Sequence, residues 1–310
     1  MKTRTLLLAL LLLVAGYVTY ELGGGRNPLQ YITGTLQTES ATTKPAPAPA
    51  QETQTATPPG ESALVLSAPP RESIEEGDKR FGPIADYLSR TLGRKVVYKH
   101  SGTWGGYQSD MLNGAYDVVF DGPHFVSWRV EKLGHNVLVK LSGEFHYVGF
   151  VRKDNTRIKD IQQLAGQPVC VHAPPNLGTL ILLSVFDNPS RQPVIVVSEG
   201  YDKIYQGVTE GKCVAGMLPK VHLKKHDISD TYMRVMYSHR SIPEQAITAG
   251  LRLSADEQTK ITEALLAPGT EAVLAGFREA YAFGGWFVRA TNEEYACLGA
   301  YLNPIQGFYK

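Results

Sequence analysis

Short apolar runs alternate with helical patterns along most of this 310-residue chain. The first run, residues 63–67, is followed by apolar residues at helical spacing over residues 78–92, and Gly93 marks the end of that helix. Further strand and helix patterns lead to a strand at residues 137–141. Successive β-α-β units are typical of a parallel sheet with helices on its faces. The sequence therefore predicts an α/β fold.

The same order of patterns begins again after a strand predicted at residues 146–152, whose alternation differs from that of the earlier runs. Strand patterns then alternate with helical ones as far as residue 217. Two longer helical patterns follow, at residues 254–266, which Ser254 opens as an N-cap, and at residues 270–282. We expect two lobes, with the C-terminal helices packed on the first. The predicted bounds are residues 62–147 plus 243–310 for lobe 1 and residues 148–242 for lobe 2.

The N-terminal segment has the layout of a secretory signal. Lys2 and Arg4 precede an uncharged, leucine-rich run at residues 5–20. Residues 1–22 are therefore predicted to be either a signal peptide that is removed or an uncleaved signal anchor. Residues 23–61 are rich in Pro and Thr and predict a disordered linker. The expected location is the periplasm, either free or tethered to the inner membrane.

The charge balance bears on the possible partners, and the cysteine count bears on the possible disulfides. The chain has 31 basic and 30 acidic residues, a balance that gives no reason to expect a nucleic-acid partner. Its three cysteines are too few for a disulfide framework. Cys170 and Cys213 both fall in predicted strands of lobe 2, where they either form a disulfide or stay as buried thiols.

The stretch at residues 116–128, YDVVFDGPHFVSW, is expected to form one wall of a ligand cleft. Its apolar run predicts a buried strand that stops at Asp121, and a helix can begin at His124. Ligands of open α/β sheets bind at the carboxyl ends of strands, because loop amides and helix N-termini converge there.

Seven stretches of the chain resemble, in the same order, the phosphate/phosphite/phosphonate-type (PhnD-like) substrate-binding proteins of ABC transporters. They cover most of residues 64–295 and read LSAPPRES, FGPIADYL, LNGAYDVVFDGP, YVGFVRKD, IKDIQQLAGQPV, IYQGVTEGKCVAG and WFVRATNEEY. The resemblance implies a two-lobed, type 2 periplasmic binding protein fold, each lobe a mainly parallel sheet flanked by helices, with a cleft between the lobes. It also implies an exported, monomeric solute-binding protein that delivers a small ligand to an ABC permease. No cofactor and no catalysis are expected.

The resemblance places the ligand between the lobes, at loops that follow strands and at helix N-termini, where an anion is favoured. Phosphonate binders usually offer serines before the glycine of the second-lobe loop, whereas this chain has Pro175 and Leu177 there. Arg71 follows the first strand and is a further candidate to pair with an anion. The predicted ligand-binding residues are Arg71, Thr103, Tyr107, Asp121, His124, His146, Tyr147, His172, Asn176 and Thr179.

Histidines in the expected cleft loops raise a second possibility for the ligand. His124, His146 and His172 either donate hydrogen bonds to an oxyanion, pack at loop ends, or together ligate a metal ion or metal complex. His222 and His226 lie four residues apart, but the neighbouring lysines favour a solvated helix surface for them.

Two other functions stay open at this point. A membrane-tethered sensor that reports ligand occupancy to a signalling partner suits a permanent anchor and a long linker. A pyrimidine-synthase-like enzyme shares the expected fold. That enzyme, however, is cytosolic and carries a cysteine-rich iron motif, whereas this chain has an export signal and no such motif.

Overall fold

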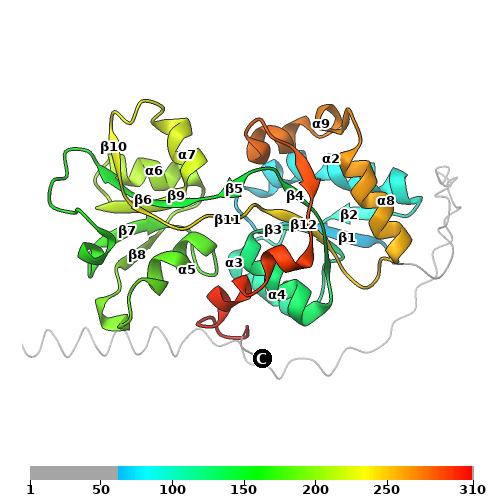
Figure 1. Cartoon of the computed structure of the whole chain (residues 1–310), viewed down its shortest axis with the longest axis horizontal. Coiled ribbons are helices and arrows are strands. Elements are labelled where there is room, and N and C mark those ends of the chain that lie inside the picture. The colour runs from blue at the N-terminus through cyan, green and yellow to red at the C-terminus, as the bar shows by residue number, and fades with distance from the viewer. Residues whose placement is uncertain (1–61, 309–310) are drawn as a thin grey trace, which may run out of the picture. The chain divides into compact units, whose positions relative to one another are not determined.

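Residues 62–308 are described by a computed structural model of the chain. They contain two large sheets within one compact unit, joined by a short two-stranded ribbon. Figure 1 shows the two sheets next to each other, each with helices around it. We call the first sheet and the helices packed on it lobe 1, and the second sheet with its helices lobe 2. The predicted signal segment, 1–22, and linker, 23–61, lie outside the described residues.

Lobe 1 is built on a mixed sheet of six strands. Its order is β13-β4-β12-β3-β1-β2. The pairs of β1 with β2 and with β3 are parallel, while β12 and β13, which come late in the chain, run antiparallel to their neighbours. The strands are β1 (Leu64–Ser67), β2 (Val96–Tyr98), β3 (Val118–Asp121), β4 (Asn136–Leu141), β12 (Ala246–Ala249) and β13 (Phe287–Arg289).

The alternation of side chains along a strand divides the lobe 1 core between the two faces of the sheet. Leu64 and Leu66 of β1 pack on one face, with α2, α8 and α10. Val65 points to the other face, which α3 and α4 cover. The helices are α2 (Ile74–Leu92), α3 (Trp104–Leu112), α4 (Pro123–Leu133), α8 (Ala255–Leu266), α9 (Thr270–Val273) and α10 (Ala275–Phe277), with a π-helix at Arg278–Ala282.

Several helix bounds differ from those predicted. Helix α2 begins at Ile74 rather than at residue 78, because Ser73 and Glu76 form a capping box at its start. Helix α4 begins at Pro123, one residue before the start expected at His124, since proline is well placed in the first turn of a helix. The single helix predicted at residues 270–282 is wrong. It is broken at Leu274, whose backbone leaves the helical region, and it ends where Phe283 adopts a left-handed conformation.

Lobe 2 is built on a mixed sheet of five strands in the order β10-β6-β9-β7-β8. Strand β7 is parallel to β8 and β9, while β6 runs antiparallel to both of its neighbours. The elements are β6 (Tyr147–Arg152), β7 (Pro168–Val171), α5 (Leu177–Ser184), β8 (Val194–Val197), α6 (Tyr201–Thr209), β9 (Ala215–Pro219), α7 (Lys220–His226) and β10 (Met233–Ser238), with 3-10 turns at Ile161–Leu164 and Pro189–Arg191.

Cys170 and Cys213 form a disulfide in lobe 2, which decides between the two alternatives left by the sequence. Val169 and Val171 of β7 point to the core beside α5, whereas Cys170 points to the opposite face beside α6. There Gly207 of α6 lies so close that an added Cβ would stand 2.6 Å from Cys170 Sγ. The disulfide thus ties β7 to the segment that leads from α6 into β9.

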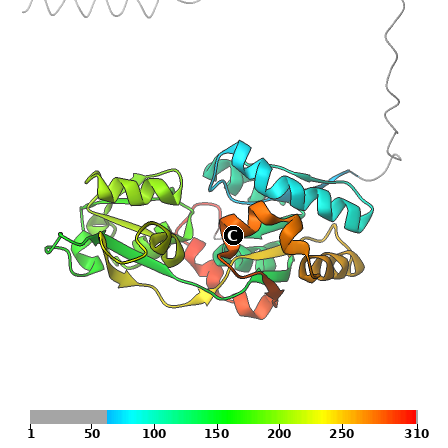
Figure 2. The same cartoon turned by 90° about the horizontal axis from the view of Figure 1, so that it is seen from above.

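The chain passes between the lobes through two strands that pair with each other. Strand β5 (Glu144–Phe145) leads into lobe 2, and β11 (Ile242–Pro243) leads back antiparallel to it. Figures 1 and 2 both show these green and yellow segments side by side between the two sheets. The two connections between the lobes are therefore adjacent in space.

The C-terminal segment contacts both lobes. After β13 the chain forms 3-10 turns at Asn292–Tyr295 and Leu298–Leu302, and the second of these packs on α4 of lobe 1 and on α5 of lobe 2. Leu302 shares a buried cluster with Leu180 of α5. The hydroxyl of Tyr301 lies 2.8 Å from Nε2 of His239, just past β10.

Candidate functional site

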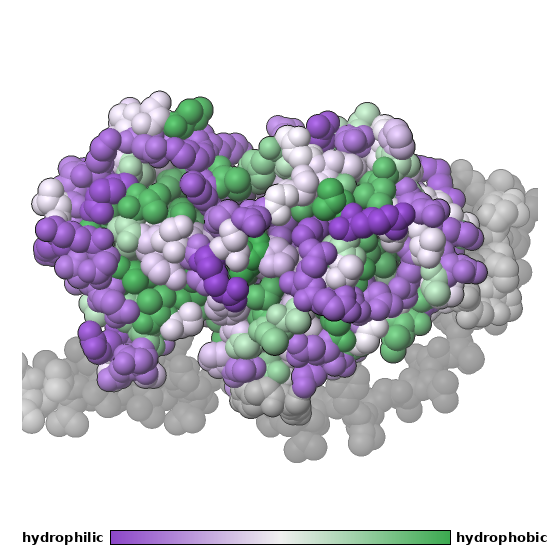
Figure 3. Space-filling view, in the orientation of Figure 1, coloured by the Kyte–Doolittle hydropathy of each residue, from purple (hydrophilic) through white to green (hydrophobic). Residues whose placement is uncertain are grey.

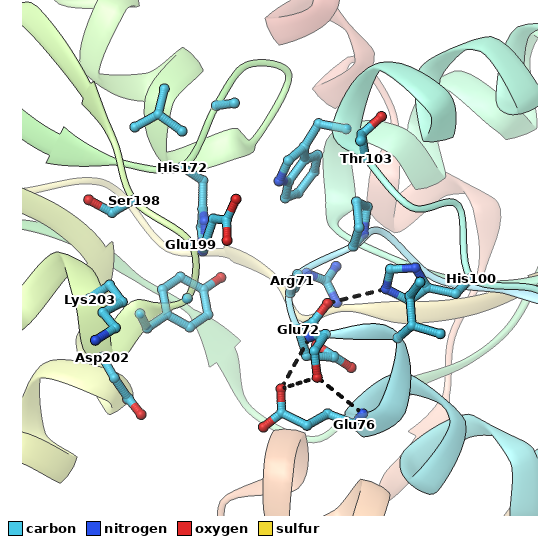
Figure 4. A pocket seen from close by; sticks show the side chains of 18 of the residues that line it. Arg71, Glu72, Glu76, His100, Thr103, His172, Ser198, Glu199, Asp202 and Lys203 are labelled. Carbon is cyan, nitrogen blue, oxygen red and sulfur yellow. Dashed lines mark hydrogen bonds between the residues drawn. The ribbon is translucent and has the colours of Figure 1, made fainter.

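A pocket of about 810 Å³ opens between the carboxyl ends of strands from the two sheets. Its lobe 1 wall comes from the loop after β1, the start of α2, the loop before α3 and the π-helix. Its lobe 2 wall comes from the loops after β7 and β8 and from α7. Figure 4 shows these walls facing each other, with Arg71, Glu72, Glu76, His100 and Thr103 on one side and His172, Ser198, Glu199, Asp202 and Lys203 on the other. The surface seen in Figure 3 is largely hydrophilic along the outer edges of both lobes.

Most charges on the lobe 1 wall neutralise one another. Arg80 lies 3.4 Å from Glu72 and 3.7 Å from Glu76. Glu72 also accepts a hydrogen bond from the hydroxyl of Tyr281, and His100 Nε2 lies 3.2 Å from the Glu72 carbonyl oxygen. These contacts hold the loop after β1 against α2 and the π-helix. Arg71, in the same loop, takes no part in these contacts.

The guanidinium of Arg71 is charged and forms no ion pair with a carboxylate of the described residues. It lies over the rings of Phe120 and Tyr281, 5.6 and 5.7 Å from their centroids. Its Nη1 is buried and makes no hydrogen bond within residues 62–308. Burial lowers the pKa of Arg71, yet neighbouring tyrosines and carboxylates raise it by more, so the pKa stays above its ordinary value. A buried N–H group of a cation without an acceptor is costly, and an anionic ligand would supply that acceptor.

Aromatic rings line the pocket across the gap between the lobes. Trp104 of α3 stands 6.0 Å from His172, centroid to centroid, and His172 stands 4.9 Å from Tyr201. His222 of α7 packs 4.1 Å from Tyr201 and 5.0 Å from Phe283 of lobe 1. The solvated surface predicted for His222 is therefore wrong, because this histidine lies against the opposite lobe and lines the pocket.

A small recess continues from the pocket toward the ribbon between the lobes. Arg71, Trp104 and Tyr201 line both spaces. The recess measures about 10 Å³, and its other walls are Gly122, His124, Phe125, Phe145, Tyr147, Asn176, Leu177 and Gln245. His124 reaches across the lobes, with Nε2 3.0 Å from the carbonyl oxygen of Pro175. The recess thus has room for about one water molecule.

One glycine allows the recess to take this shape. Gly178 sits in the first turn of α5, directly against the ring of Tyr147, and an added Cβ would stand 2.6 Å from Tyr147 Cε1. Asn176 caps the same helix, since its side-chain oxygen accepts a hydrogen bond from Gly178 N at 2.9 Å. The loop after β7 is held in place by these short-range contacts.

Six of the ten residues predicted to bind the ligand lie at these two spaces. Arg71 lines both of them. Thr103 and His172 line the larger pocket, and His124, Tyr147 and Asn176 line the recess. These six residues stay candidates for ligand contact.

Tyr107 and Asp121, by contrast, lie beneath the site rather than in it. Both side chains are fully buried and form a hydrogen-bonded network with Arg129 of α4. Asp121 accepts hydrogen bonds from Arg129 Nε at 2.7 Å and from the hydroxyl of Tyr107 at 2.5 Å. Arg129 Nη2 lies 2.9 Å from the Tyr107 hydroxyl oxygen. Their polar atoms are therefore already used, and the network fixes α3 and α4 on the end of β3.

Thr179 and His146 also lie elsewhere. Thr179 is fully buried and donates a hydrogen bond to the His172 carbonyl oxygen at 2.6 Å, so it supports the loop from below. His146 borders a separate hollow beside the ribbon, 3.4 Å from Glu144. Among residues 62–308, no group of three His, Cys, Asp or Glu side chains is arranged to hold a metal ion. The alternative in which His124, His146 and His172 share a metal is therefore wrong, because each lines a different hollow.

The loop after β8 and the residues of the π-helix line the pocket but were not predicted from the sequence. The rule that places ligands at the carboxyl ends of strands applies to β8 as well as to β7, so Ser198 and Tyr201 could have been found. Tyr281 could not have been found, because a single straight helix was predicted over residues 270–282. The actual π-helix brings the Tyr281 hydroxyl to Glu72.

Fold and pocket together define a two-lobed binding protein that encloses a small solute between α/β lobes. Several solved structures share this fold. XAC2383 from Xanthomonas citri bound to ATP has a TM-score of 0.63, 16% identity, and covers 81% of this chain and 100% of its own. PhnD1 from Prochlorococcus marinus in complex with methylphosphonate has a TM-score of 0.63, 17% identity, and coverage of 79% and 98%. A binding protein component of an ABC phosphonate transporter from Pseudomonas aeruginosa has a TM-score of 0.59, 11% identity, and coverage of 76% and 84%.

At such identities these likenesses show the fold alone, and no curated protein sequence matches the chain. The family is shown by sequence. The model of the ABC transporter, phosphonate, periplasmic substrate-binding protein family matches residues 66–295. The chain therefore belongs to this family of periplasmic transport proteins, which bind a small ligand and deliver it to a permease complex.

Proposed function

We propose that this protein captures a small oxyanion of the phosphate or phosphonate type between its lobes and hands it to an ABC importer. The observation that carries the proposal is Arg71, a charged and half-buried side chain whose buried Nη1 has no hydrogen-bond partner in the described part of the chain. It lines both the pocket and the recess, so a ligand in either space would meet it. A hydrogen bond between charged groups stabilises a complex by about 1.5–3 kcal/mol.

Several finer points belong to the same proposal. The protein acts as a monomer, binds its ligand without transforming it, and is held at the inner membrane by its N-terminal segment. This last point rests on the apolar run at residues 5–20, which lies outside the described residues. Within residues 62–308, none of the helices is both long and apolar enough to span a bilayer.

The direct test is to measure binding of inorganic phosphate and of methylphosphonate to the purified protein by isothermal titration calorimetry. We expect Arg71→Gln to lower the affinity for the ligand that binds by about 10- to 100-fold, because one charged hydrogen bond is lost. Arg252→Gln is the matched control. This arginine also belongs to lobe 1, but it pairs with Asp117 and does not line the pocket.

Unchanged affinity in Arg71→Gln, or an equal loss in Arg252→Gln, would contradict the proposed site. Absence of binding by either probe to the wild-type protein would contradict the oxyanion as ligand. A role as a tethered sensor uses the same binding step, and ligand uptake by cells distinguishes the two. Deleting the gene abolishes uptake if the protein serves an importer and leaves uptake intact if it serves a sensor.

A further inference from the structure

His124 presents a fixed hydrogen-bond acceptor to the recess. Its Nε2 lies 3.0 Å from the carbonyl oxygen of Pro175, and a carbonyl can only accept. The ring hydrogen therefore sits on Nε2, and in the neutral imidazole Nδ1 carries a lone pair. This Nδ1 is buried and finds no hydrogen-bond partner among the residues described.

The surroundings of His124 keep the ring neutral. Burial lowers the pKa of His124 to about 3, with a further decrease from the charge of Arg71, although the Pro175 carbonyl opposes the shift. The other titratable groups that line the recess are Arg71, Tyr147 and Tyr201. The pKa values of both tyrosines are raised, chiefly by burial, so their hydroxyls stay protonated. Near neutral pH the recess thus combines one cation with a neutral imidazole acceptor.

Arg71 and His124 both line this recess, so a group held there lies against both side chains. The recess volume of about 10 Å³ suits one water-sized group, such as a single ligand oxygen. That oxygen would accept a hydrogen bond from Arg71. To satisfy His124 Nδ1 it must also donate one, which an ionised oxygen cannot do. A bare anionic oxygen would instead place its lone pairs against the lone pair of Nδ1.

We infer that the site takes an oxyanion carrying at least one hydroxyl, such as a hydrogen phosphonate or hydrogen phosphate, and rejects oxyanions of the same shape without a proton, such as sulfonates and sulfate. His124 is the residue that makes this distinction, and Arg71 supplies the attraction common to both. The inference rests on the proposed oxyanion function and adds the protonation state of the ligand to it.

The test compares methylphosphonate with methanesulfonate, which have the same shape but differ in the proton. Calorimetry is done at one pH, about 5, where a phosphate-type group with a second pKa of about 6 mostly holds its second proton. We expect the wild-type protein to bind methylphosphonate at least tenfold more tightly, because an unsatisfied buried acceptor costs about 1–3 kcal/mol. A single pH also keeps the protonation of Glu244, which lines the hollow beside the ribbon, constant.

Two variants assign the preference to His124. His124→Phe keeps a planar ring but has no acceptor, so the ratio of the two affinities should fall toward one. His124→Gln retains an amide oxygen as acceptor and should preserve the preference. If His124→Phe does not fold in thermal melts, the wild-type ratio and the Gln variant still decide the question.

The outcomes separate the two levels of the proposal. If neither probe binds the wild-type protein, the oxyanion function itself fails. If both bind with similar affinity, that function stands and the inference is overturned, as when a water molecule fills the recess and donates to His124. A preference that persists in His124→Phe overturns the role of this histidine.

Discussion

The buried contact between Asp121 and Arg129 predicts a large effect on stability and shows how a cleft residue can be mistaken for a ligand contact. Both side chains are completely buried. Asp121→Asn would leave the Arg129 charge without a carboxylate inside the protein. We expect the free energy of unfolding to fall by about 3–5 kcal/mol, measured by urea denaturation.

The matched control for Asp121→Asn is a substitution in an ion pair on the surface. Lys79 and Glu75 lie 2.8 Å apart on α2, with both side chains largely exposed. Glu75→Gln should change the free energy of unfolding by no more than about 0.5 kcal/mol. Equal effects of the two substitutions would show that the buried network contributes little to stability.

At the level of elements, the start of α2 positions the most important side chain of the site. Ser73 accepts a hydrogen bond from Glu76 N, and Glu76 accepts one from Ser73 N, two residues after Arg71. Ser73→Ala should lower the free energy of unfolding by about 1 kcal/mol. It should also weaken oxyanion binding, because the loop that carries Arg71 loses its attachment to the helix.

Ser254→Ala is the control for this prediction. Ser254 forms the same capping box with Glu257 at the start of α8, which does not line the pocket. This variant should lose a similar stability in thermal or chemical denaturation and bind as the wild type does. If both variants bind normally, the cap of α2 does not control the position of Arg71.

The starts of α2 and α8 show which features of the fold could be predicted from the sequence. The cap at Ser254 was predicted, because a serine directly precedes a clear apolar period. The cap at Ser73 was missed, since the first turn of α2 is mostly exposed and gives little apolar signal. The order of strands and helices was predictable from short-range patterns. The break at Leu274 was not, because Leu274 is buried in a core cluster whose other members lie far apart in the chain, and tertiary packing can override local propensity.

For the site residues, the sequence predicted the position of each residue at the end of the sheet better than the direction of its side chain. Arg71, His124 and His172 follow strands and line the cleft as expected. Tyr107 and Thr179 occupy equivalent loop and helix positions, yet their side chains turn into the core. The sequence gives the place of each residue at the end of the sheet, whereas the direction of a side chain depends on its neighbours from other elements.

For the whole molecule, buried histidines predict a loss of stability in acid. Burial is the first cause that lowers the pKa of four of them: to about 3 for His124, His135 and His222, and to about 4 for His172. Below about pH 6.5 the unfolded chain takes up protons that the folded protein does not. Stability should therefore fall as the pH drops from about 6.5 toward 4, by up to about 1.4 kcal/mol per pH unit for each histidine.

Denaturation curves over this pH range give the measurement, and His135 gives the test. This histidine lies outside the cleft, with Nδ1 3.1 Å from Thr248 Oγ1. In His135→Gln the free energy of unfolding should depend less steeply on pH, by the contribution expected for one histidine. A slope that does not change in the variant would mean that His135 takes up its proton equally in the folded and unfolded states.

Glu244 should act in the opposite sense. Burial raises its pKa to about 7, so the folded protein holds a proton that the unfolded chain has already released. Stability should fall on this account as the pH rises from about 4.5 to 7. Glu244→Gln removes the titration and should make the protein more stable than the wild type at pH 8, where the charged carboxylate is buried. Equal stability of both proteins at that pH would contradict the assignment.

The C-terminal segment affects how easily the two lobes can move apart. Residues Leu298–Leu302 pack on α4 and on α5, helices that belong to different lobes. Any rotation that moves α5 away from α4 has to detach the segment from one of these helices and expose the apolar cluster that Leu302 shares with Leu180. None of the residues Leu298–Leu302 lines the pocket, so separation of the lobes is opposed by a patch of chain outside the ligand site.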